Sequence, residues 1–302
     1  MTRPAGPLVI GLGEALFDCF PDHQVLGGAP INLVVHLNAL LQPHGGQALP
    51  LTRVGDDPLG IRFFDELSDR GVDTVAVQTD PHEPTGVVEV HASDEGETHY
   101  CFAPNMAWDR LVATTDGHRL VACGDAICFG TLAQRRMASR HAIQSLLASA
   151  TDSIRLLDVN LRQDFFSRQV LHESLQAATA AKLNAQELLT VSEQLGLAAD
   201  PELLAQEYEL DWVAVTHGER GTSLHHRGEV MKAVVPKFAK APAADSVGAG
   251  DACAAGLLYG VLRSWDWPPT VELANRLGAY VASQPGATPA LPAELIPGVT
   301  DD

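Results

Sequence analysis

Several features are missing from this chain of 302 residues, and each absence excludes a class of protein. No run of about eighteen apolar residues occurs, so we expect no membrane-spanning helix and no membrane partner. The apolar stretch near the N-terminus is interrupted by Gly11, Gly13 and Glu14, too early for a secretory signal peptide. The five cysteines are never spaced as C-x-x-C, which is typical of buried thiols in a reducing compartment. We therefore expect a cytoplasmic protein.

Positive charge is also scarce. The chain has 20 Lys and Arg against 38 Asp and Glu, which gives a formal net charge of -18. Because proteins bind nucleic acids by neutralising phosphates with Lys and Arg, this acidity argues against a nucleic-acid partner. An anionic substrate is repelled at long range as well, so any phosphate site must be built locally from backbone dipoles, a few cations and a metal.

The motifs of several common catalytic sites are absent too. No G-x-x-x-x-G-K-[ST] sequence exists, which excludes a P-loop. The segment G-L-G-E-A-L at 11–16 lacks the third small residue of a dinucleotide fingerprint, which argues against an NAD-dependent oxidoreductase. Neither H-E-x-x-H nor G-x-S-x-G occurs, so zinc proteases and α/β-hydrolases are excluded.

Apolar runs typical of strands alternate with helical patterns along the chain. Continuous apolar strands separated by helices predict a parallel sheet that is covered on both faces. We therefore expect an α/β fold. The predicted strands lie at 7–13, 51–54, 125–130, 154–159 and 211–216, and clear helical patterns lie at 61–71 and 134–150.

Two segments break this alternation. Residues 85–92 and 97–103 flank the turn residues 93–96, which predicts an antiparallel hairpin. Residues 15–20 predict a further short strand. A small sheet of this kind would cover a pocket at the carboxyl ends of the main strands.

The strongest candidate for a catalytic site is D-S-V-G-A-G-D at 245–251. The small residues 248–250 leave a nearly bare backbone at the start of an apolar helix, which we expect to be buried and which Asp245 or Ser246 could cap. Backbone amides at a helix start, together with the helix dipole, form a site for an anion. Asp251 in the first turn could accept a hydroxyl proton. Taken alone, G-A-G fits a capped core helix with a glycine-rich entry equally well. The acidic residues on both sides of the glycines and the small side chains that follow favour the catalytic interpretation.

A second candidate is G-G-A-P-I-N at 27–32, which precedes another apolar helix. The glycines allow the backbone to approach a ligand closely, and Pro30 presets the helix start. Asn32 lies one turn into the helix, where it could bind a ligand or simply be solvated. An ordinary turn-to-helix junction would explain the glycines and Pro30 as well.

These motifs resemble, in order, those of the ribokinase-like (PfkB-type) carbohydrate kinases. D-S-V-G-A-G-D resembles the family's D-T-x-G-A-G-D signature, with Ser246 in place of Thr. The second Asp of that signature is the catalytic base, which implies this role for Asp251. The amides of the G-A-G segment form the anion hole, which implies that role for Gly248, Ala249 and Gly250.

The resemblance also implies a sugar site. G-G-A-P-I-N resembles the family's G-G-x-x-x-N motif, which assigns Gly27, Gly28 and Asn32 to the sugar, and Asp18 stands where the family has an acidic sugar ligand. A carboxylate and an amide suit the vicinal hydroxyls of a polyol. D-V-N-L-R is similar to the D-x-N-x-R strand end and places Arg162 near substrate or phosphate, although a solvated Arg explains it nearly as well.

Three further segments imply a site for ATP and metal ions. K-L-N-A-Q-E resembles the family's K-x-N-x-x-E segment, in which Glu187 would hold Mg²⁺ through water. Asp245 would match an acidic residue near a site for a monovalent cation such as K⁺. The residues implied to bind ATP are Asn184, Thr216, Gly218, Gly221 and Asn275.

The resemblance covers the chain from Gly13 to about Pro292. It implies one ribokinase-like domain over 1–302, a three-layer α/β/α fold with a small β-sheet lid inserted at about 14–32 and 84–106. The implied reaction is phosphoryl transfer from Mg·ATP to a sugar hydroxyl, with an Asp general base and a glycine-rich anion hole. A homodimer through the lid is an option that the resemblance leaves open.

Fructose is the favoured substrate, because GEALFDCF, GGAPIN and DVNLR look most like the fructokinase branch. Fructokinases often carry an Arg after an aromatic residue in the lid strand, and residues 101–105 contain none. Ribose, 2-keto-3-deoxygluconate and nucleosides therefore stay open as substrates. A catalytically silent sugar- or nucleotide-binding protein on the same fold is the alternative to an enzyme.

Overall fold

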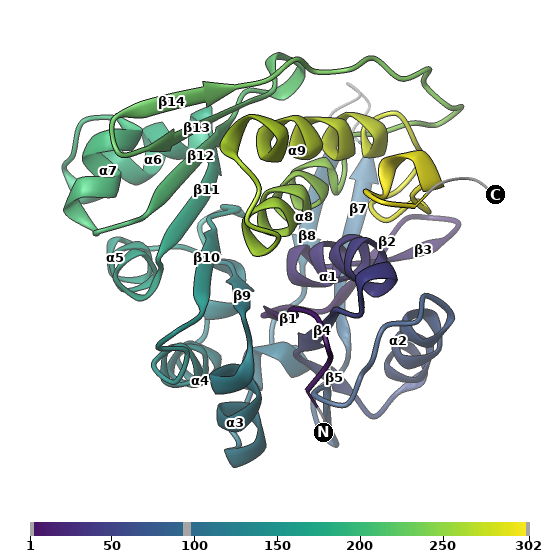
Figure 1. Ribbon diagram of the computed structural model, residues 1–302. Coiled ribbons are helices and arrows are strands. Elements are labelled where there is room, and N and C mark those ends of the chain that lie inside the picture. Colours follow the sequence, from purple (N-terminus) through teal and green to yellow (C-terminus); the bar gives the residue numbers. More distant parts are fainter. Residues whose placement is uncertain (1–2, 93–97, 300–302) are drawn as a thin grey trace.

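The computed structural model describes residues 3–92 and 98–299. Its centre is an eight-stranded sheet in the order β14-β13-β12-β11-β10-β9-β1-β4, between two layers of helices (Figure 1). Neighbouring strands from β12 to β4 are parallel, whereas β12–β13 and β13–β14 pair antiparallel. The strands are β1 (Leu8–Leu12), β4 (Gln47–Leu51), β9 (Ala126–Phe129), β10 (Ile154–Asp158), β11 (Ala180–Asn184), β12 (Trp212–Thr216), β13 (Thr222–His226) and β14 (Glu229–Lys232).

The side chains of the sheet alternate between two apolar cores. Val9 and Cys128 belong to one core, and their neighbours Ile10 and Phe129 belong to the other. Both faces of the sheet are therefore buried, as the continuous apolar strands predict. Helices α1 (Ala29–Leu41), α2 (Pro58–Asp69), α8 (Ala249–Leu262) and α9 (Trp267–Val281) contribute to the first core, and α3 (Thr115–Cys123), α4 (Met137–Leu147), α5 (Arg168–Ala177), α6 (Ala185–Leu195) and α7 (Pro201–Glu207) to the second.

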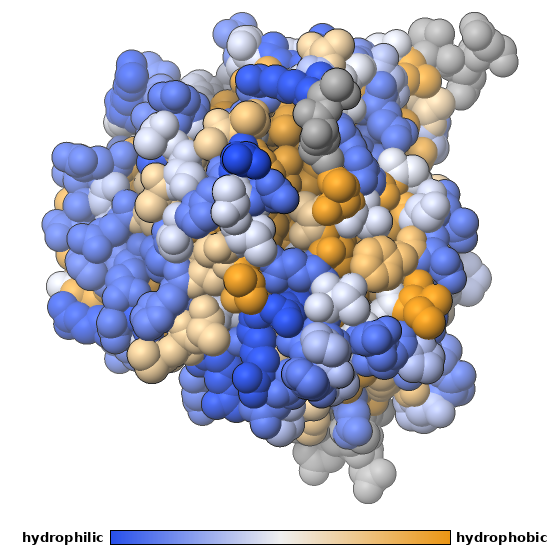
Figure 2. Space-filling view, turned by 90° about the horizontal axis from the view of Figure 1, so that it is seen from below, coloured by the Kyte–Doolittle hydropathy of each residue, from blue (hydrophilic) through white to orange (hydrophobic). Residues whose placement is uncertain are grey.

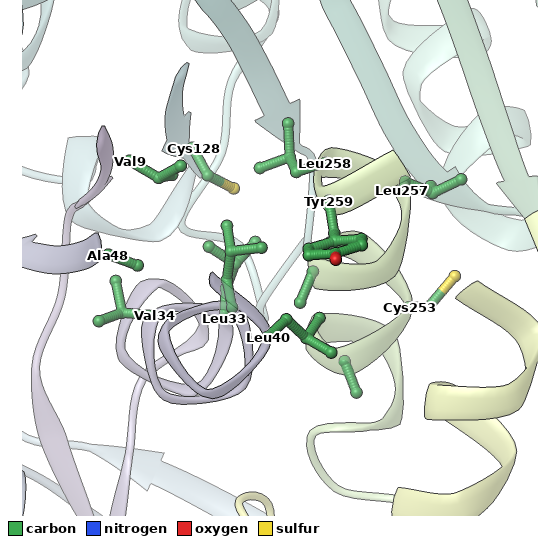
Figure 3. Close-up of a cluster of buried hydrophobic side chains, with 14 of the residues drawn as sticks. Val9, Leu33, Val34, Leu40, Ala48, Cys128, Cys253, Leu257, Leu258 and Tyr259 are labelled. Carbon is green, nitrogen blue, oxygen red and sulfur yellow. The ribbon is translucent and has the colours of Figure 1, made fainter. Parts of the chain in front are cut away.

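Helix α1 packs beside α8 on one face of the sheet. Figure 3 shows Val34 of α1 next to Ala48 of β4, and Leu258 and Tyr259 of α8 near Leu33 of α1. Helix α8 also packs against α9, and every residue from Asp251 to Gly260 is buried. This burial explains why the sequence of α8 is apolar nearly all round.

A second sheet has four strands in the order β3-β2-β7-β8. Its strands are β2 (Leu16–Cys19), β3 (Gln24–Gly27), β7 (Gly86–Ala92) and β8 (Thr98–Phe102). The predicted hairpin is the antiparallel pair β7–β8, and the predicted turn at 93–96 lies outside the described residues. All four strands fall inside the two ranges expected for the lid, although residues 29–32 belong to α1 instead. That this sheet closes over a pocket stays a prediction.

The strand expected at 51–54 is divided between two sheets. Leu51 ends β4 in the central sheet, and β5 (Arg53–Gly55) pairs with β6 (Gln78–Asp80) in a separate two-stranded sheet. Between them, the hydroxyl of Thr52 donates to the carbonyl oxygen of Gly13 at 2.6 Å. Short 3₁₀ helices complete the described chain: η1 (Gln42–His44), η2 (Ala107–Arg110), η3 (Leu132–Gln134), η4 (Gly218–Arg220) and η5 (Ala293–Leu295).

The surface is largely hydrophilic on the face that Figure 2 shows, with hydrophobic residues gathered toward its middle. Within residues 3–92 and 98–299, we find no helix that combines the length and the apolar character needed to cross a membrane.

Candidate active site

The two glycine-rich motifs of the sequence meet in the interior of the molecule. Asn32 lies in the first turns of α1, and Asp251 lies in the first turn of α8. The side-chain amide of Asn32 donates a hydrogen bond from Nδ2 to Oδ2 of Asp251 at 2.8 Å, and both residues are buried. The predicted sugar motif and the predicted base are therefore in direct contact.

Helix α8 begins without a side-chain cap. Its N-cap residue is Gly248, which has a φ of 76°, so the prediction that Asp245 or Ser246 caps this helix is wrong. The Asp245 carboxylate instead accepts hydrogen bonds from the amides of Val247 at 2.8 Å and Gly286 at 3.1 Å. It holds the turn before the helix, because these two amides belong to loops rather than to the helix. Among the described residues, no side chain caps this helix start, and the amide of Ala249 donates to the carbonyl oxygen of Ser246 at 3.3 Å.

Gly248 is required by both conformation and space. Its positive φ is unfavourable for other residues, and a Cβ there would collide with the carbonyl oxygen of Ala287. Gly250 is different, because it has no positive φ and lies within α8. The narrow approach between this helix start and the segment around Ala287 therefore depends on Gly248.

Asp251 is surrounded by charges of both signs. Burial raises the pKa of its carboxyl, and the nearby Asp158 raises it further. Lys182, the hydrogen bond from Asn32 and Arg162 lower it, and the result is a pKa of about 6. A carboxyl of this kind is mostly ionised at neutral pH and can accept a proton from a neighbouring hydroxyl.

The residues predicted to hold the sugar surround the start of α1. Gly28 is the N-cap of α1 with a φ of 103°. A Cβ on Gly27 would lie 2.8 Å from Oδ2 of Asp18, so glycine leaves that carboxylate accessible along β2 and β3. Burial raises the pKa of Asp18 to about 6, while Arg162 lowers it and Asp245 raises it. The exposed Arg162 thus acts electrostatically on both Asp18 and Asp251.

Glu14 is a candidate residue of this site to which the sequence motifs assigned no role. It follows β1, is 3% exposed, and its Oε2 has no hydrogen-bond partner. Burial raises the pKa of Glu14 to about 7, although the backbone amides of Glu14 and Ala29 and the charge of Arg162 lower it. Asp251 also acts on this carboxyl and raises its pKa. The signal in the sequence is a carboxylate directly after an apolar strand and a glycine.

The predicted nucleotide residues gather at the carboxyl ends of β11 and β12. Asn184 ends β11 and pairs in register with Thr216 at the end of β12. Gly218 and Gly221 follow in the next loop, with φ angles of 60° and 81°. A Cβ on Gly221 would lie 2.9 Å from Nδ2 of the buried Asn275, which brings α9 to this loop. Ligands commonly bind at such an edge of an open α/β sheet.

Asn184 and Glu187 already have structural partners. Asn184 caps α6 by accepting from the amides of Gln186 and Glu187 at 2.9 and 2.8 Å. The Glu187 carboxylate accepts from the amides of Asn184 at 2.7 Å and Leu161 at 2.9 Å. Each Glu187 oxygen keeps a free lone pair, so the residue fits a water-mediated contact to Mg²⁺. In the described chain no group of three or more His, Cys, Asp or Glu could hold a metal ion by itself. Mg²⁺ sites that rely on one or two carboxylates and substrate phosphates need no such group.

Comparison with known proteins identifies the family. Residues 14–294 match the pfkB family of carbohydrate kinases. The chain belongs to this family. It is an ATP-dependent carbohydrate kinase, and the predicted ribokinase-like α/β fold is confirmed.

Individual relatives support the same assignment. The chain is 32% identical to a fructokinase of Escherichia coli, over 93% of this chain and 95% of that protein. A fructokinase of Xylella fastidiosa with bound ATP has the same fold, with a TM-score of 0.80, 22% identity and 93% of each chain covered. A fructokinase of Vibrio cholerae with fructose, ADP and calcium bound is 25% identical, with a TM-score of 0.77 and 96% and 97% of the chains covered.

Proposed function

We propose that this kinase phosphorylates fructose, with Asp251 as the general base. The observation that carries the proposal is the buried hydrogen bond between Asn32 and Asp251, because it joins the glycine-rich start of α1 to that of α8. The preference for fructose is supported by the likeness to the E. coli fructokinase and to the V. cholerae structure that holds fructose and ADP.

In the proposed reaction, Asp251 accepts the proton of a sugar hydroxyl while the hydroxyl oxygen attacks the γ-phosphorus of ATP. The bond between that phosphorus and the bridging oxygen breaks, and ADP leaves. The backbone amides of Gly248, Ala249 and Gly250 stabilise the charge on the transferred group. With a net charge of -18 on the protein, such local donors must offset repulsion of ATP at long range.

Asp18 and Asn32 would hydrogen-bond the sugar hydroxyls, with Arg162 at the exposed side of the site. The glycine pair Gly27 and Gly28 lets the sugar approach the backbone between β3 and α1. Asn32 then has two partners: its Nδ2 holds Asp251, and its buried Oδ1, which has no hydrogen-bond partner, is free to accept from a hydroxyl.

ATP would lie along the ends of β11 and β12. Mg²⁺, when bound, neutralises charge on the phosphate oxygens, and Glu187 would hold it through water. Asp245 would lie near a monovalent cation; each of its oxygens already accepts one amide and keeps a further lone pair. The residues that we propose for ATP are Asn184, Thr216, Gly218, Gly221 and Asn275.

We also propose that the four-stranded sheet acts as a lid. Gln163, in the loop after β10, donates from Nε2 to the carbonyl oxygen of Tyr100 in β8 at 2.5 Å, which ties the sheet to the strand ends. Closure would exclude water, which competes with the sugar as phosphoryl acceptor. The outer strands β3 and β8 are the places where a second copy could pair in a homodimer, and sedimentation of the purified protein would test this.

A coupled assay of ADP release tests the proposed substrate. The panel contains fructose, ribose, 2-keto-3-deoxygluconate and a nucleoside, and each is measured with the wild-type protein and with Asp251→Asn. We expect the highest kcat/KM with fructose and loss of turnover in the variant. A higher kcat/KM with another acceptor would contradict the choice of fructose, and it would agree with the missing Arg in residues 101–105.

A further inference from the structure

Two buried charges lie beneath the start of α8. Asp158 ends β10 and Lys182 lies in β11, and each residue is 5% exposed. The Lys182 ammonium donates to both carboxylate oxygens of Asp158 at 2.9 Å. Burying two charges costs desolvation that their attraction often only just offsets, so this pair is poorly explained as a source of stability.

The pairing of the strands aims both side chains at α8. Asp158 lies opposite Lys182 in the parallel register of β10 and β11. Their neighbours Leu157 and Ala181 belong to the core on the other side of the sheet, so Asp158 and Lys182 point to the layer that contains α8. A Cβ on Gly250 would lie 3.3 Å from Nζ of Lys182. The backbone conformation at position 250 does not require glycine. We therefore attribute this glycine to the space that the ammonium group of Lys182 needs.

Lys182 is the buried cation among the groups that act on Asp251. Burial lowers the pKa of the Lys182 ammonium, but Asp158, Cys253 and Asp251 together more than offset this effect, so Lys182 stays charged. Arg162, the other cation that acts on Asp251, is exposed. The remaining titratable or polar groups that face Asp251 are Glu14 after β1, Asn32 on α1, Cys128 on β9 and Asp158 on β10.

We propose that Lys182 is a positioning residue for phosphoryl transfer: Asp158 holds its ammonium behind the first turn of α8, where it keeps the Asp251 carboxylate charged and adds positive charge beneath the anion site. The inference rests on the proposed function of Asp251. It also gives Asp158 a role, since without this carboxylate the ammonium would have no fixed place. In this arrangement Lys182 lowers the pKa of Asp251 and Asp158 raises it.

The pH dependence of kcat/KM measures how Lys182 and Asp158 change the ionisation of Asp251. Replacing Lys182 by Met leaves two buried carboxyls without a buried cation between them, so the acidic limb should move to higher pH by about one unit or more. Asp158→Asn removes the carboxylate that opposes ionisation of Asp251, so the limb should move to lower pH. If the pair had only a structural role, both variants would have a lower melting temperature, and the acidic limb would not shift in opposite directions.

The buried pair Arg135 and Asp109 provides a matched control. Its atoms Nη2 and Oδ2 are 2.7 Å apart, its side chains are 4% and 3% exposed, and neither residue is among the charges that act on Asp251. Asp109→Asn should lower the melting temperature and leave the limb unmoved. If Lys182→Met does not fold, Lys182→Gln takes its place: an upward shift of the limb supports the proposal, and an unmoved limb overturns it.

Failure of this inference is separable from failure of the proposed function. Asp251→Asn with near-normal turnover would overturn both. Loss of turnover in Asp251→Asn together with unmoved limbs in folded Lys182→Met and Asp158→Asn would overturn only the role of Lys182.

Discussion

The starts of α1 and α8 are built alike and differ in what surrounds them. Each begins at a glycine with positive φ, Gly28 at 103° and Gly248 at 76°, and neither has a side-chain cap. At α1 the nearby carboxylate is Glu14, which is buried and precedes the helix in the chain. At α8 the carboxylate is Asp251, which lies within the first turn.

The two helix starts therefore differ in the groups that can bind to their backbone amides. The amides of α1 already have a carboxylate close by, because the amide of Ala29 acts on Glu14. In the described chain the start of α8 has no side-chain cap, and the Asp251 carboxylate accepts from Asn32 instead. We therefore expect the start of α1 to take neutral hydroxyl groups and the start of α8 to take an incoming phosphate.

The largest expected effect is at the start of α8. Asp251→Asn keeps the size of the side chain and removes its basicity, so kcat should fall by about 10²–10⁴-fold. Circular dichroism and ATP affinity should stay close to those of the wild type. A fall in kcat of less than about tenfold would show that Asp251 is not the base.

The two glycines of that helix start should respond differently to alanine. Gly248→Ala must adopt a positive φ and push against Ala287, so we expect a loss of about 1–3 kcal/mol in the free energy of unfolding. Gly250→Ala has an ordinary helical conformation and meets only Nζ of Lys182, at 3.3 Å, so its loss should be smaller. Urea denaturation measures both, and equal losses would contradict the distinction drawn between these glycines.

The carboxylate at the start of α1 should limit stability above neutral pH. The pKa of Glu14 is raised from 4.5 to about 7 in the folded protein, so the contribution of its neutral form is present below pH 4.5 and is lost as pH rises through 7. Glu14→Gln should therefore raise the melting temperature at about pH 8 by a few degrees relative to its effect at about pH 4. The same change at both pH values would contradict the raised pKa.

The smallest expected effects are on sugar binding. Asp18→Asn should weaken fructose affinity by about 0.5–1.5 kcal/mol and leave kcat and ATP affinity nearly unchanged. Asn32→Ala should weaken fructose affinity and also lower kcat, because it removes the hydrogen bond to Asp251. Calorimetry and steady-state kinetics separate the two, and unchanged fructose affinity in both variants would remove them from the sugar site.

In the central sheet, the sequence predicts most of the apolar strands and misses β11, β13 and β14, which carry polar residues. The runs at 125–130, 154–159 and 211–216 correspond to β9, β10 and β12. The sequence does not predict strand β11, because Lys182 interrupts its apolar pattern and the run that follows suits an amphipathic helix. The charge there is satisfied by Asp158 in the neighbouring strand, a contact that depends on strand register and cannot be derived from local pattern.

The candidate site shows the same limit. The small residues 248–250 and the first-turn Asp251 could be predicted, because helix chemistry is local. The contact between Asn32 and Asp251 could not, since it depends on how α1 and α8 pack against each other. The sequence predicts Asp245 or Ser246 as the cap of α8. The Asp245 carboxylate instead accepts hydrogen bonds from the amides of Val247 and Gly286, and Gly286 comes from a distant segment.

The pH dependence of kcat/KM for fructose tests the role of Asp251 most directly. The pKa of about 6 for Asp251 predicts that kcat/KM rises with pH to a plateau, with half of the plateau value near pH 6. Asp18 has a similar pKa, so the profile is measured in Asp18→Asn as well, where the limb near pH 6 should remain. A flat profile between about pH 5 and 8, or a limb that disappears in Asp18→Asn, would contradict Asp251 as the base.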